Sequence, residues 1–584
     1  MDNQQIAGTL EEIGDLLEID GANRFRVLAY KKAAETLRGL GRDIKDIYKE
    51  NPDELENLPG IGQDLRSKIE EMLQTGHCQY HRELVKKFGH GLLDILKIRG
   101  IGPKKVALFY HELGIDNLEK LKAAALAKKL SKLPRMGEKS ELEILQAMEE
   151  HSKYSRRMLL SEALPLAEEI IDYLKRLKTI AQIQYAGSLR RRKETVGDLD
   201  ILVAPKNIKD AGAIIEFFQK FPKVSNIVAN GPTKCSVIMA NGVQADLRVV
   251  ETKSFGAALH YFTGSKDHNV EIRTIAIKAN KKINEYGIHD LVKQKDGTII
   301  EKFIVGDTEE KFYKAVGLEY IPPTLRESRG EFQAVIDRNL PELVELEDLR
   351  GDLNVNSNYG SGKATLSDIF KTYEKAGHQY LAIADQFTCT EHPTDFNNHQ
   401  LEEQLTEINK LATKFPKLKI FRSIKLSIKK DGSLELPDAK LLKQIDFITV
   451  RINSDFALPE VIQTKRLLLG LNAHPKIKQL SAPNARLLNE RTPLAINIEK
   501  IILACVQQKI ILEVNSNPHR LDLFDNQIKL AINKDANLSI NSDLIQLTDL
   551  DNLKYGLWTA QRGWAEKKNI LNAQPLNRLT ELLT

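Results

Sequence analysis

Residues 187–200 read GSLRRRKETVGDLD, and their last residues open an apolar run, residues 201–204, that predicts a buried strand. Because side chains alternate along a strand, Asp198 and Asp200 share one face while Leu199 points into the core. Adjacent carboxylates repel each other unless a cation lies between them, and Mg²⁺ accepts such ligands together with phosphate oxygens. The stretch therefore predicts a metal site at the start of a strand.

The residues before this strand add groups that hold phosphate. Gly187 and Ser188 offer backbone amides and a hydroxyl, and Arg190, Arg191 and Arg192 offer guanidinium groups. An isolated pair of aspartates is more often an exposed strand start than a metal site. The arginines, the Gly-Ser pair and a third aspartate downstream favour the metal site.

That third aspartate lies in a predicted β-hairpin. Residues 237–240 and 243–249 read as two strands joined by an Asn-Gly turn, and Asp246 lies on the face opposite the apolar residues of its strand. If a neighbouring strand placed Asp246 beside Asp198 and Asp200, the three carboxylates could hold two metal ions roughly 3.5–4 Å apart. One ion would lower the pKa of an attacking hydroxyl, and the other would hold a triphosphate.

The composition is typical of a soluble, multidomain protein. A chain of 584 residues is too long for one core and, at roughly 150 residues per domain, predicts three to five units. The net charge of +5 is small for this length, so nucleic-acid binding would need local basic patches. The four cysteines form no metal pattern, as expected in a reducing cytoplasm. No apolar run approaches the ~20 residues of a membrane span, and the first residues lack a signal-peptide core, so no membrane partner is expected.

The first 150 residues predict a helical region with a repeated glycine turn. The sequence LPGIG at residues 58–62 recurs as IRGIG at 98–102 and, more weakly, as LPRMG at 133–137, each before a predicted helix. The glycines allow a tight turn, and the free N–H groups of the next helix then face a phosphate. A single such turn is a common structural connection, whereas the repeats favour binding to the DNA backbone. The residues expected to contact DNA are Gly60, Gly62, Gly100, Gly102, Lys104 and Lys105.

The sequence HYFTGSKDHN at residues 260–269, continuing to Arg273, makes a resemblance specific. Together with GSLRRR…GDLD and Asp246, it resembles the family X DNA polymerases. The sequence GLEYIPP at residues 317–323 and the long extension after it resemble the bacterial PolX form in particular. The resemblance covers essentially the whole chain.

The resemblance implies a DNA-directed DNA polymerase that fills short gaps in DNA repair. Asp198 and Asp200 would bind both Mg²⁺ ions, for which Mn²⁺ can substitute, and Asp246 would bind the catalytic one. Na⁺ or K⁺ can bind at the glycine turns. The partners would be gapped or primed duplex DNA and dNTPs, for a monomer in the cytoplasm at the nucleoid. The residues assigned to the nucleotide are Gly187, Ser188, Arg191, Gly197, Tyr261, Phe262, Gly264, Lys266, Asn269 and Arg273.

Lys68 lies six residues after Gly62, on the helix that follows the first turn. Its residue type alone permits a phosphate contact, a solvated surface residue, or a nucleophile with a lowered pKa. The resemblance places Lys68 at the Schiff-base position of a deoxyribose-phosphate lyase, and Tyr30 at another lyase position. Phe25 and Asp64 stand where DNA polymerase beta has basic residues that hold the 5′-phosphate, so a weak lyase is expected.

Beyond residue 346, predicted strands and helices alternate. Helices at 365–376 and 497–508 precede strands at 380–384 and 510–514, with further strand-like runs at 447–450, 467–471 and 538–540. The alternation favours parallel βα units, open or closed into a barrel, with an active site at the carboxyl ends of the strands. The region resembles the PHP phosphoesterase domain, a manganese- or zinc-dependent 3′–5′ exonuclease in active PolX enzymes.

The metal ligands of that domain are largely replaced in this sequence. Only His474 and Asp543 keep the ligand identity, and Lys425 puts a positive charge where the resemblance implies a glutamate ligand. Asparagine is a poor substitute for histidine as a ligand of a transition metal. A folded, inactive domain is therefore expected, serving as a scaffold or a DNA contact, with His474 structural. The other replaced positions are Asn354, Asn356, Ser361, Gln386, Asn453 and Ile545.

The expected fold is multidomain: N-terminal all-α helix-hairpin-helix domains, an α+β nucleotidyltransferase palm with a thumb, and a C-terminal α/β distorted (βα) barrel of PHP type. A nucleotidyltransferase acting on RNA ends or small molecules is one alternative, which the glycine turns disfavour. A non-enzymatic DNA-binding scaffold is another, which the three aspartates disfavour. The expected segments are 1–85 (lyase-like), 86–150 (DNA-binding), 151–255 (palm), 256–325 (thumb), 326–345 (linker) and 346–584 (PHP-like).

Overall fold

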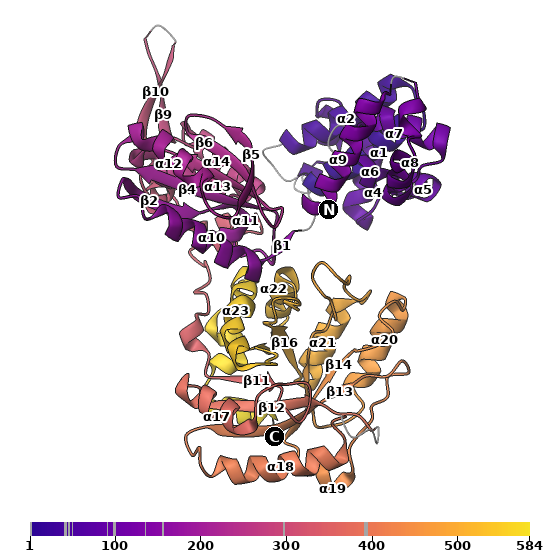
Figure 1. The fold of residues 1–584 in the computed structure, drawn as a ribbon, viewed down its shortest axis with the longest axis vertical. Helices are drawn as coiled ribbons and strands as arrows, with labels where there is room; N and C mark the ends of the chain where they lie inside the picture. Colours follow the sequence, from indigo (N-terminus) through magenta and orange to yellow (C-terminus); the bar gives the residue numbers. More distant parts are fainter. Residues whose placement is uncertain are drawn as a thin grey trace. The chain divides into compact units, whose positions relative to one another are not determined.

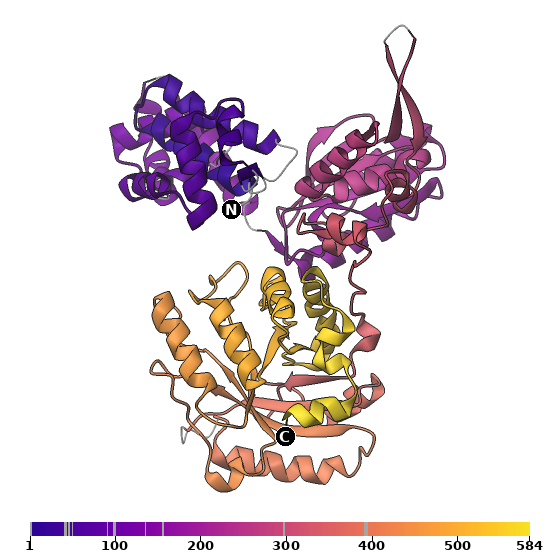
Figure 2. The same ribbon diagram turned by 180° about the vertical axis from the view of Figure 1, so that it is seen from behind.

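The computed structural model describes residues 3–39, 44, 47–48, 51–89, 91–96, 98, 101–134, 136–154, 157–295, 298–389 and 395–583. The chain divides into two compact units, Met1–Arg156 and Arg157–Thr584 (Figures 1 and 2). No helix in these ranges is both long and apolar enough to cross a bilayer.

The first unit is helical, and one hydrophobic core runs through it from Ile6 to Met148. Ile6, Leu10, Ile13 and Leu17 are all buried, as their helical spacing predicts. The helices are α1 (Asn3–Ile19), α2 (Arg24–Gly39), α4 (Gln63–Thr75), α5 (Gln79–Phe88), α6 (Gly91–Leu96), α7 (Pro103–Leu113), α8 (Leu118–Leu126) and α9 (Glu138–Tyr154).

The second unit begins with a five-stranded mixed sheet, which we call the sheet region (residues 157–254). Its strands are ordered β2-β4-β7-β6-β5. Helices α10 (Leu160–Leu174) and α12 (Ala211–Gln219) share a core with one face, and α13 (Phe255–Thr263) packs on the other. The strands are β2 (Ile180–Tyr185), β4 (Asp198–Pro205), β5 (Val224–Asn230), β6 (Lys234–Met239) and β7 (Gln244–Val249).

The next part of the chain covers residues 255–325. It contains α13, α14 (Lys266–Lys278), an antiparallel sheet of three strands, and α15 (Glu309–Ala315). Its core includes Ile272, Ile288, Phe312 and Tyr313. The three strands are β8 (Lys281–Asn284), β9 (Gly287–Lys293) and β10 (Ile299–Val305). A connector with the short helix α16 (Glu331–Ile336) then leads into the C-terminal part of the chain.

The C-terminal part, which we call the barrel (residues 346–583), is a parallel sheet of seven strands in sequence order. A parallel bridge from Val355 to Leu544 joins the first strand to the segment after the last, so the sheet is nearly closed. In Figures 1 and 2, helices cover the outer side of the strands. The strands are β11 (Gly351–Val355), β12 (Tyr380–Gln386), β13 (Lys419–Ser427), β14 (Phe447–Arg451), β15 (Ile477–Leu480), β16 (Ile511–Asn515) and β17 (Leu538–Asn541).

The predicted βα alternation is confirmed, with one wrong element. The run at 467–471, predicted as a strand, is the end of helix α20 (Glu460–Leu471). Gln463, Leu467 and Leu471 are buried at helical spacing, a period that five apolar residues alone do not reveal. The other helices of the barrel are α17 (Leu366–Lys375), α18 (Asn398–Ala412), α19 (Ala439–Leu442), α21 (Ile498–Gln508), α22 (Asp525–Asn533), α23 (Leu553–Arg562) and α24 (Leu576–Leu583).

Candidate active site in the sheet region

Three aspartates meet on two neighbouring strands of the sheet region. Strands β4 and β7 are parallel, and their register pairs Asp200 with Asp246. A carboxylate oxygen from each of Asp198, Asp200 and Asp246 lies within 4.8 Å of the other two. The predicted hairpin of β6 and β7 is also present, with Gly242 at its turn. In the ranges that the structure describes, this is the only group of three or more such side chains so arranged.

The electrostatics of the three aspartates favour a bound cation. Burial raises the pKa of Asp200 to about 7, and the charges of Asp198 and Asp246 add to this rise. Burial, followed by the charge of Asp246, also raises the pKa of Asp198. A divalent cation would offset this repulsion, and carboxylate oxygens are the hard ligands that Mg²⁺ prefers. The donor set therefore fits the metal that the sequence predicts.

Two further side chains act on these carboxylates, one by hydrogen bonds and one by its charge. The Gln244 amide donates to both carboxylate oxygens of Asp246, at 3.1 Å each. The Arg248 guanidinium lies 4.5 Å from the centre of the Phe262 ring and counteracts the rise in the pKa of Asp200. Sequence reasoning missed Gln244, although its spacing of two residues from Asp246 puts both on one face of the strand.

The Gly-Ser loop approaches the aspartates closely. Gly187 begins the short helix α11 (Gly187–Arg190), directly before Ser188, and has a φ of +60°. A Cβ atom on Gly187 would lie 2.3 Å from Oδ2 of Asp200. Glycine is therefore required here both for its backbone conformation and for its lack of a side chain. Gly197 is also crowded, since a Cβ there would lie 2.9 Å from a nitrogen of Arg157.

The three arginines after Ser188 have different partners. Arg190 forms a bidentate pair with Glu309 at 2.9 and 2.5 Å, so it is occupied within the protein. Arg191 donates from Nε to Glu327 at 3.0 Å and also to the Thr263 carbonyl. Arg192 lies over the Trp558 ring, 4.0 Å from its centre. Unlike Arg190, Arg191 shares its carboxylate partner, because Glu327 also pairs with Lys193 and Arg562.

The end of α13 brings several of the predicted nucleotide-binding residues together. Asn269 donates to the Tyr261 carbonyl at 2.7 Å, and Arg273 lies 5.3 Å from the centre of the Tyr261 ring. Tyr261 and Phe262 contact edge to face. Gly264 follows α13 with a φ of +65°, and Lys266 is the first residue of α14. Six of the residues expected at the nucleotide thus gather at the junction of α13 and α14.

The glycine turns of the first unit share one hydrogen-bond pattern. Backbone N–H groups of Ile61, Ile101 and Met136 each donate to the carbonyl three residues earlier at 3.1 Å. Gly60 has a φ of +81°, and Gly62 and Gly102 directly precede helices α4 and α7. Lys104 and Lys105 lie in the first turn of α7. Gly100 lies outside the described residues. Backbone N–H groups at the starts of helices can donate to a phosphate oxygen.

Lys68 lies on α4, with only 15% of its side chain exposed. Its amine contacts Asp64 at 2.5 Å and lies 5.3 Å from the centre of the Tyr80 ring. Burial alone would lower the pKa of Lys68. The neighbouring Asp64 and Tyr30 outweigh this effect, so the pKa of Lys68 lies above its ordinary value. The lowered pKa that would make Lys68 a ready nucleophile is therefore not present in this arrangement.

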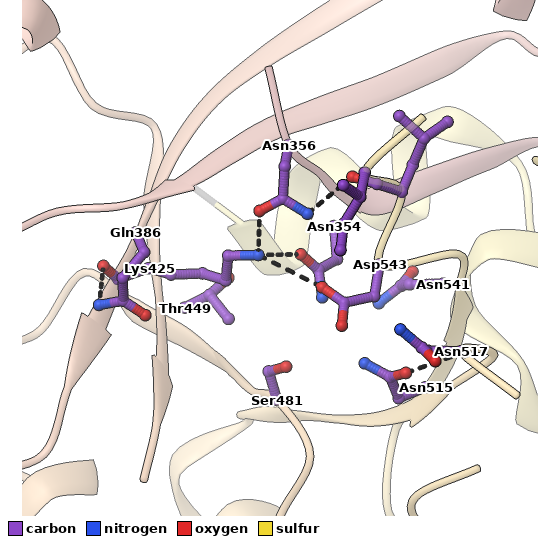
Figure 3. A network of polar contacts seen from close by, with 12 residues as sticks. Asn354, Asn356, Gln386, Lys425, Thr449, Ser481, Asn515, Asn517, Asn541 and Asp543 are labelled. Carbon is purple, nitrogen blue, oxygen red and sulfur yellow. Dashed lines mark hydrogen bonds and ion pairs between the residues drawn. The ribbon is translucent and has the colours of Figure 1, made fainter. Parts of the chain in front are cut away.

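The carboxyl ends of the barrel strands surround a buried lysine (Figure 3). The Lys425 ammonium donates to the amide oxygens of Asn354 at 3.0 Å and Asn356 at 2.5 Å, and contacts Asp543 at 3.4 Å. Burial alone would raise the pKa of Asp543. The positive charges of Lys425, Arg451 and nearby Arg520 outweigh this effect and lower that pKa below its ordinary value. Burial lowers the pKa of Lys425 below its ordinary value, and the charge of Asp543 offsets part of this fall. The Lys425 amine thus lies among the side chains where the resemblance implies metal ligands.

His474 and Asp543, the two retained ligand types, are not brought together. His474 precedes the start of β15 and accepts the backbone N–H of Lys476 at 3.1 Å, whereas Asp543 follows the end of β17. In a parallel sheet the starts and the ends of the strands lie on opposite sides of the sheet, so these two positions are far from a shared site. Sequence reasoning missed Glu513, a buried residue that accepts from Asn354 at 2.7 Å and Ser481 at 2.5 Å.

Comparisons with known proteins agree with this geometry. Residues 1–78 match a model described as helix-hairpin-helix domain, and residues 92–150 match one described as SAM-like helix-hairpin-helix tandem. Residues 258–327 match the DNA polymerase beta thumb. Helix-hairpin-helix motifs, a polymerase thumb and three clustered aspartates define a DNA polymerase, a nucleotidyltransferase that acts on DNA.

Similar proteins specify the family. The DNA polymerase/3′-5′ exonuclease PolX of Bacillus subtilis (strain 168) is 34% identical over 586 residues, which span 100% of this chain and 99% of that protein. DNA polymerase lambda of Rattus norvegicus is 23% identical over 56% of each chain. The DNA-directed DNA/RNA polymerase mu of Homo sapiens is 22% identical over 56% of this chain and 69% of its own. The chain belongs to the family X DNA polymerases, in their bacterial PolX form.

Proposed function

We propose that this polymerase fills short gaps in DNA repair, adding nucleotides from dNTPs to the primer 3′-hydroxyl as the template directs. The observation that carries the proposal is the cluster of Asp198, Asp200 and Asp246 on adjacent parallel strands. The names of the similar proteins, all DNA polymerases, support the same reaction. The enzyme would act as a monomer on gapped or primed duplex DNA, in the cytoplasm at the nucleoid.

In this mechanism Asp198 and Asp200 would hold two Mg²⁺ ions, or Mn²⁺ in their place, and Asp246 would help to hold the catalytic one. Bound metal would lower the pKa of the primer hydroxyl and neutralise charge on the triphosphate. Gln244 keeps the Asp246 carboxylate in position through two hydrogen bonds. Ser188 and Arg191 bind the triphosphate by a hydroxyl and a guanidinium group.

The α13–α14 junction selects the nucleotide. Tyr261, Phe262 and Gly264 support the sugar, and Asn269 and Arg273 sense the minor-groove edge of the new base pair, while Lys266 adds a cation near the nucleotide. Asn269 and Arg273 each contact Tyr261, so the support and the sensors are linked. The glycine turns bind the DNA backbone through the N–H groups at the starts of α4 and α7, and Na⁺ or K⁺ would bind at the same turns.

The substrate test is primer extension on matched substrates. We expect the fastest addition on a one-nucleotide gap, slower addition on an open primer–template, and incorporation only of the nucleotide complementary to the template base. Equal addition of all four nucleotides, or a preference for an RNA primer end, would support a different nucleotidyltransferase instead. The assay compares all substrates at one enzyme concentration with Mg²⁺.

Gly187→Ala tests the close approach of the phosphate loop to the metal site. The new Cβ would clash with Asp200 Oδ2 at 2.3 Å and would require a positive φ, which alone costs about 1–2 kcal/mol in an alanine. We expect kcat/KM for gap filling to fall at least about tenfold, since about 1.4 kcal/mol corresponds to a factor of ten. Gly212→Ala is the matched control, because no atom lies within 4 Å of a Cβ at Gly212. Equal activity of the two variants would contradict the assigned geometry.

We further propose that the barrel is a PHP-type domain that has lost 3′–5′ exonuclease activity. The support is the Lys425 ammonium, which lies 1% exposed among Asn354, Asn356 and Asp543. A metal ion in the same place would meet a fixed positive charge and amide oxygens in place of imidazoles.

A weak deoxyribose-phosphate lyase at Lys68 is a second proposed activity, supported by the position of Lys68 after the first glycine turn. Because Asp64 contributes to the raised pKa of Lys68, Asp64→Asn should increase the fraction of free amine and the rate of Schiff-base formation. Borohydride trapping on DNA with a 5′-deoxyribose phosphate measures the adduct. We expect a low yield in the wild type, a yield several-fold higher in Asp64→Asn, and none in Lys68→Ala. An adduct that persists in Lys68→Ala would refute the assignment.

A further inference from the structure

A carboxylate in the connector joins the phosphate-binding arginine to the barrel. Glu327 accepts from Nε of Arg191 at 3.0 Å and from Arg562, the last residue of α23, at 2.9 Å. Arg562 also donates to the backbone carbonyl of Arg191 at 2.8 Å and pairs with Asp525 at 2.6 Å. The barrel therefore contacts both the side-chain partner and the backbone of Arg191.

Neighbouring residues of the same loop also contact the barrel. Arg192 stacks on Trp558, and Glu194 forms a bidentate pair with Arg486 at 3.0 and 2.9 Å. Leu521 and Tyr555 of the barrel are buried in the core cluster of the sheet region. The loop that follows Ser188 is thus held at successive positions by barrel side chains, and the two regions share apolar packing.

The charges around Glu327 determine how firmly it holds Arg191. Burial alone would raise the pKa of Glu327. The positive charges of Arg562, Arg191 and Lys193 outweigh this effect and lower that pKa to about 2, so Glu327 is ionised at neutral pH. Two guanidinium groups share one of its oxygens. Because Glu327 divides its attraction between Arg562 and Arg191, it holds Arg191 less strongly than it would alone, and a triphosphate can compete for that guanidinium.

We propose that the barrel positions the nucleotide-binding loop of the polymerase, with Arg562 as the positioning residue that acts through Glu327 on Arg191. This inference depends on the proposed role of Arg191 at the triphosphate. It gives the barrel a function in the polymerase reaction that needs no metal site of its own. Arg562 affects the affinity for dNTP, while the metal-binding aspartates carry the chemical step.

The test compares Arg562→Gln with the double variant Arg562→Gln/Glu327→Gln. In the single variant, Glu327 has lost Arg562 and pairs fully with Arg191, so we expect the KM for dNTP to rise about tenfold while kcat stays within about twofold. In the double variant, Arg191 is released, so the KM should return to within about threefold of wild type. Arg578→Gln on α24, an exposed arginine, is the control and should match wild type.

The outcomes separate this inference from the proposed function. A merely structural role of Arg562 predicts that the double variant is at least as poor as the single, and that result would overturn the inference, as would an unchanged KM in the single variant. If the single variant does not fold, the double variant is the test: a KM for dNTP within about threefold of wild type supports the inference, and a higher KM overturns it. If Arg191→Ala leaves the KM for dNTP unchanged, the proposed role of Arg191 fails, whatever the Arg562 variants show. Equilibrium binding of dNTP, measured without turnover, should follow the same order as KM.

Discussion

Asp246→Asn is expected to reduce single-nucleotide gap filling by at least about 10³-fold, with no loss of folding. The amide keeps the shape of the side chain but removes one of three charges that hold metal, and metal-based charge stabilisation contributes several kcal/mol to such reactions. The variant also removes a repulsion that helps to raise the pKa of Asp198 and of Asp200. Its thermal midpoint without metal should therefore equal or exceed that of the wild type.

Asp172→Asn is the matched control, because it makes the same change on α10 with 77% of the side chain exposed. Rates are measured in single turnover on a gapped duplex, and DNA affinity is measured by fluorescence anisotropy in parallel. We expect DNA affinity to stay unchanged in both variants. A rate for Asp246→Asn within tenfold of wild type would mean that the chemistry does not use this triad.

Lys425→Met is expected to lower the stability of the second unit by about 3–5 kcal/mol, the usual effect of removing one partner of a buried ion pair. The substitution leaves the buried Asp543 charge without its lysine, and the amide oxygens of Asn354 and Asn356 without their donor. The thermal midpoint, followed by circular dichroism, should fall by several degrees.

A second variant separates charge from packing at this position. Lys425→Met/Asp543→Asn removes both charges and should recover a large part of the lost stability. Lys371→Met, with 66% of the lysine side chain exposed, should leave the midpoint unchanged. If Lys425→Met were as stable as wild type, or if Mn²⁺ raised its thermal midpoint more than that of wild type, Lys425 would not be a structural cation.

The local parts of this structure could be predicted from the sequence because they depend on short-range rules. Alternation along a strand put Asp198 and Asp200 on one face, and the Asn-Gly turn fixed the hairpin that carries Asp246. The repeated glycine sequences likewise predicted tight turns, which depend only on residues close together in the chain. Gln244 was within reach of the same rule, but polar residues on a half-exposed strand face are too common to single out.

The parts that were missed depend on contacts between distant residues. Arg191, Glu327 and Arg562 are separated by 136 and 235 residues, and no pattern in one sequence pairs them. His474 was grouped with Asp543 because both keep the ligand identity of the PHP family, whereas His474 lies before the start of β15 and Asp543 after the end of β17. Lys425 is an intermediate case. The sequence showed that a positive charge replaces a ligand there, but the three side chains that contact it could be identified only from the fold.

We propose that the second unit performs metal-dependent chemistry at the three aspartates, whereas in the barrel Lys425 lies where a metal ion would bind. One gel tests it: a 5′-labelled primer in a one-nucleotide gap, incubated with Mg²⁺ or Mn²⁺, with and without dNTPs, for wild type and Asp246→Asn. We predict a primer longer by one nucleotide only for wild type with dNTP, and an unchanged primer in every other lane. Shortened primer in the lanes without dNTP, persisting in Asp246→Asn, would contradict this account.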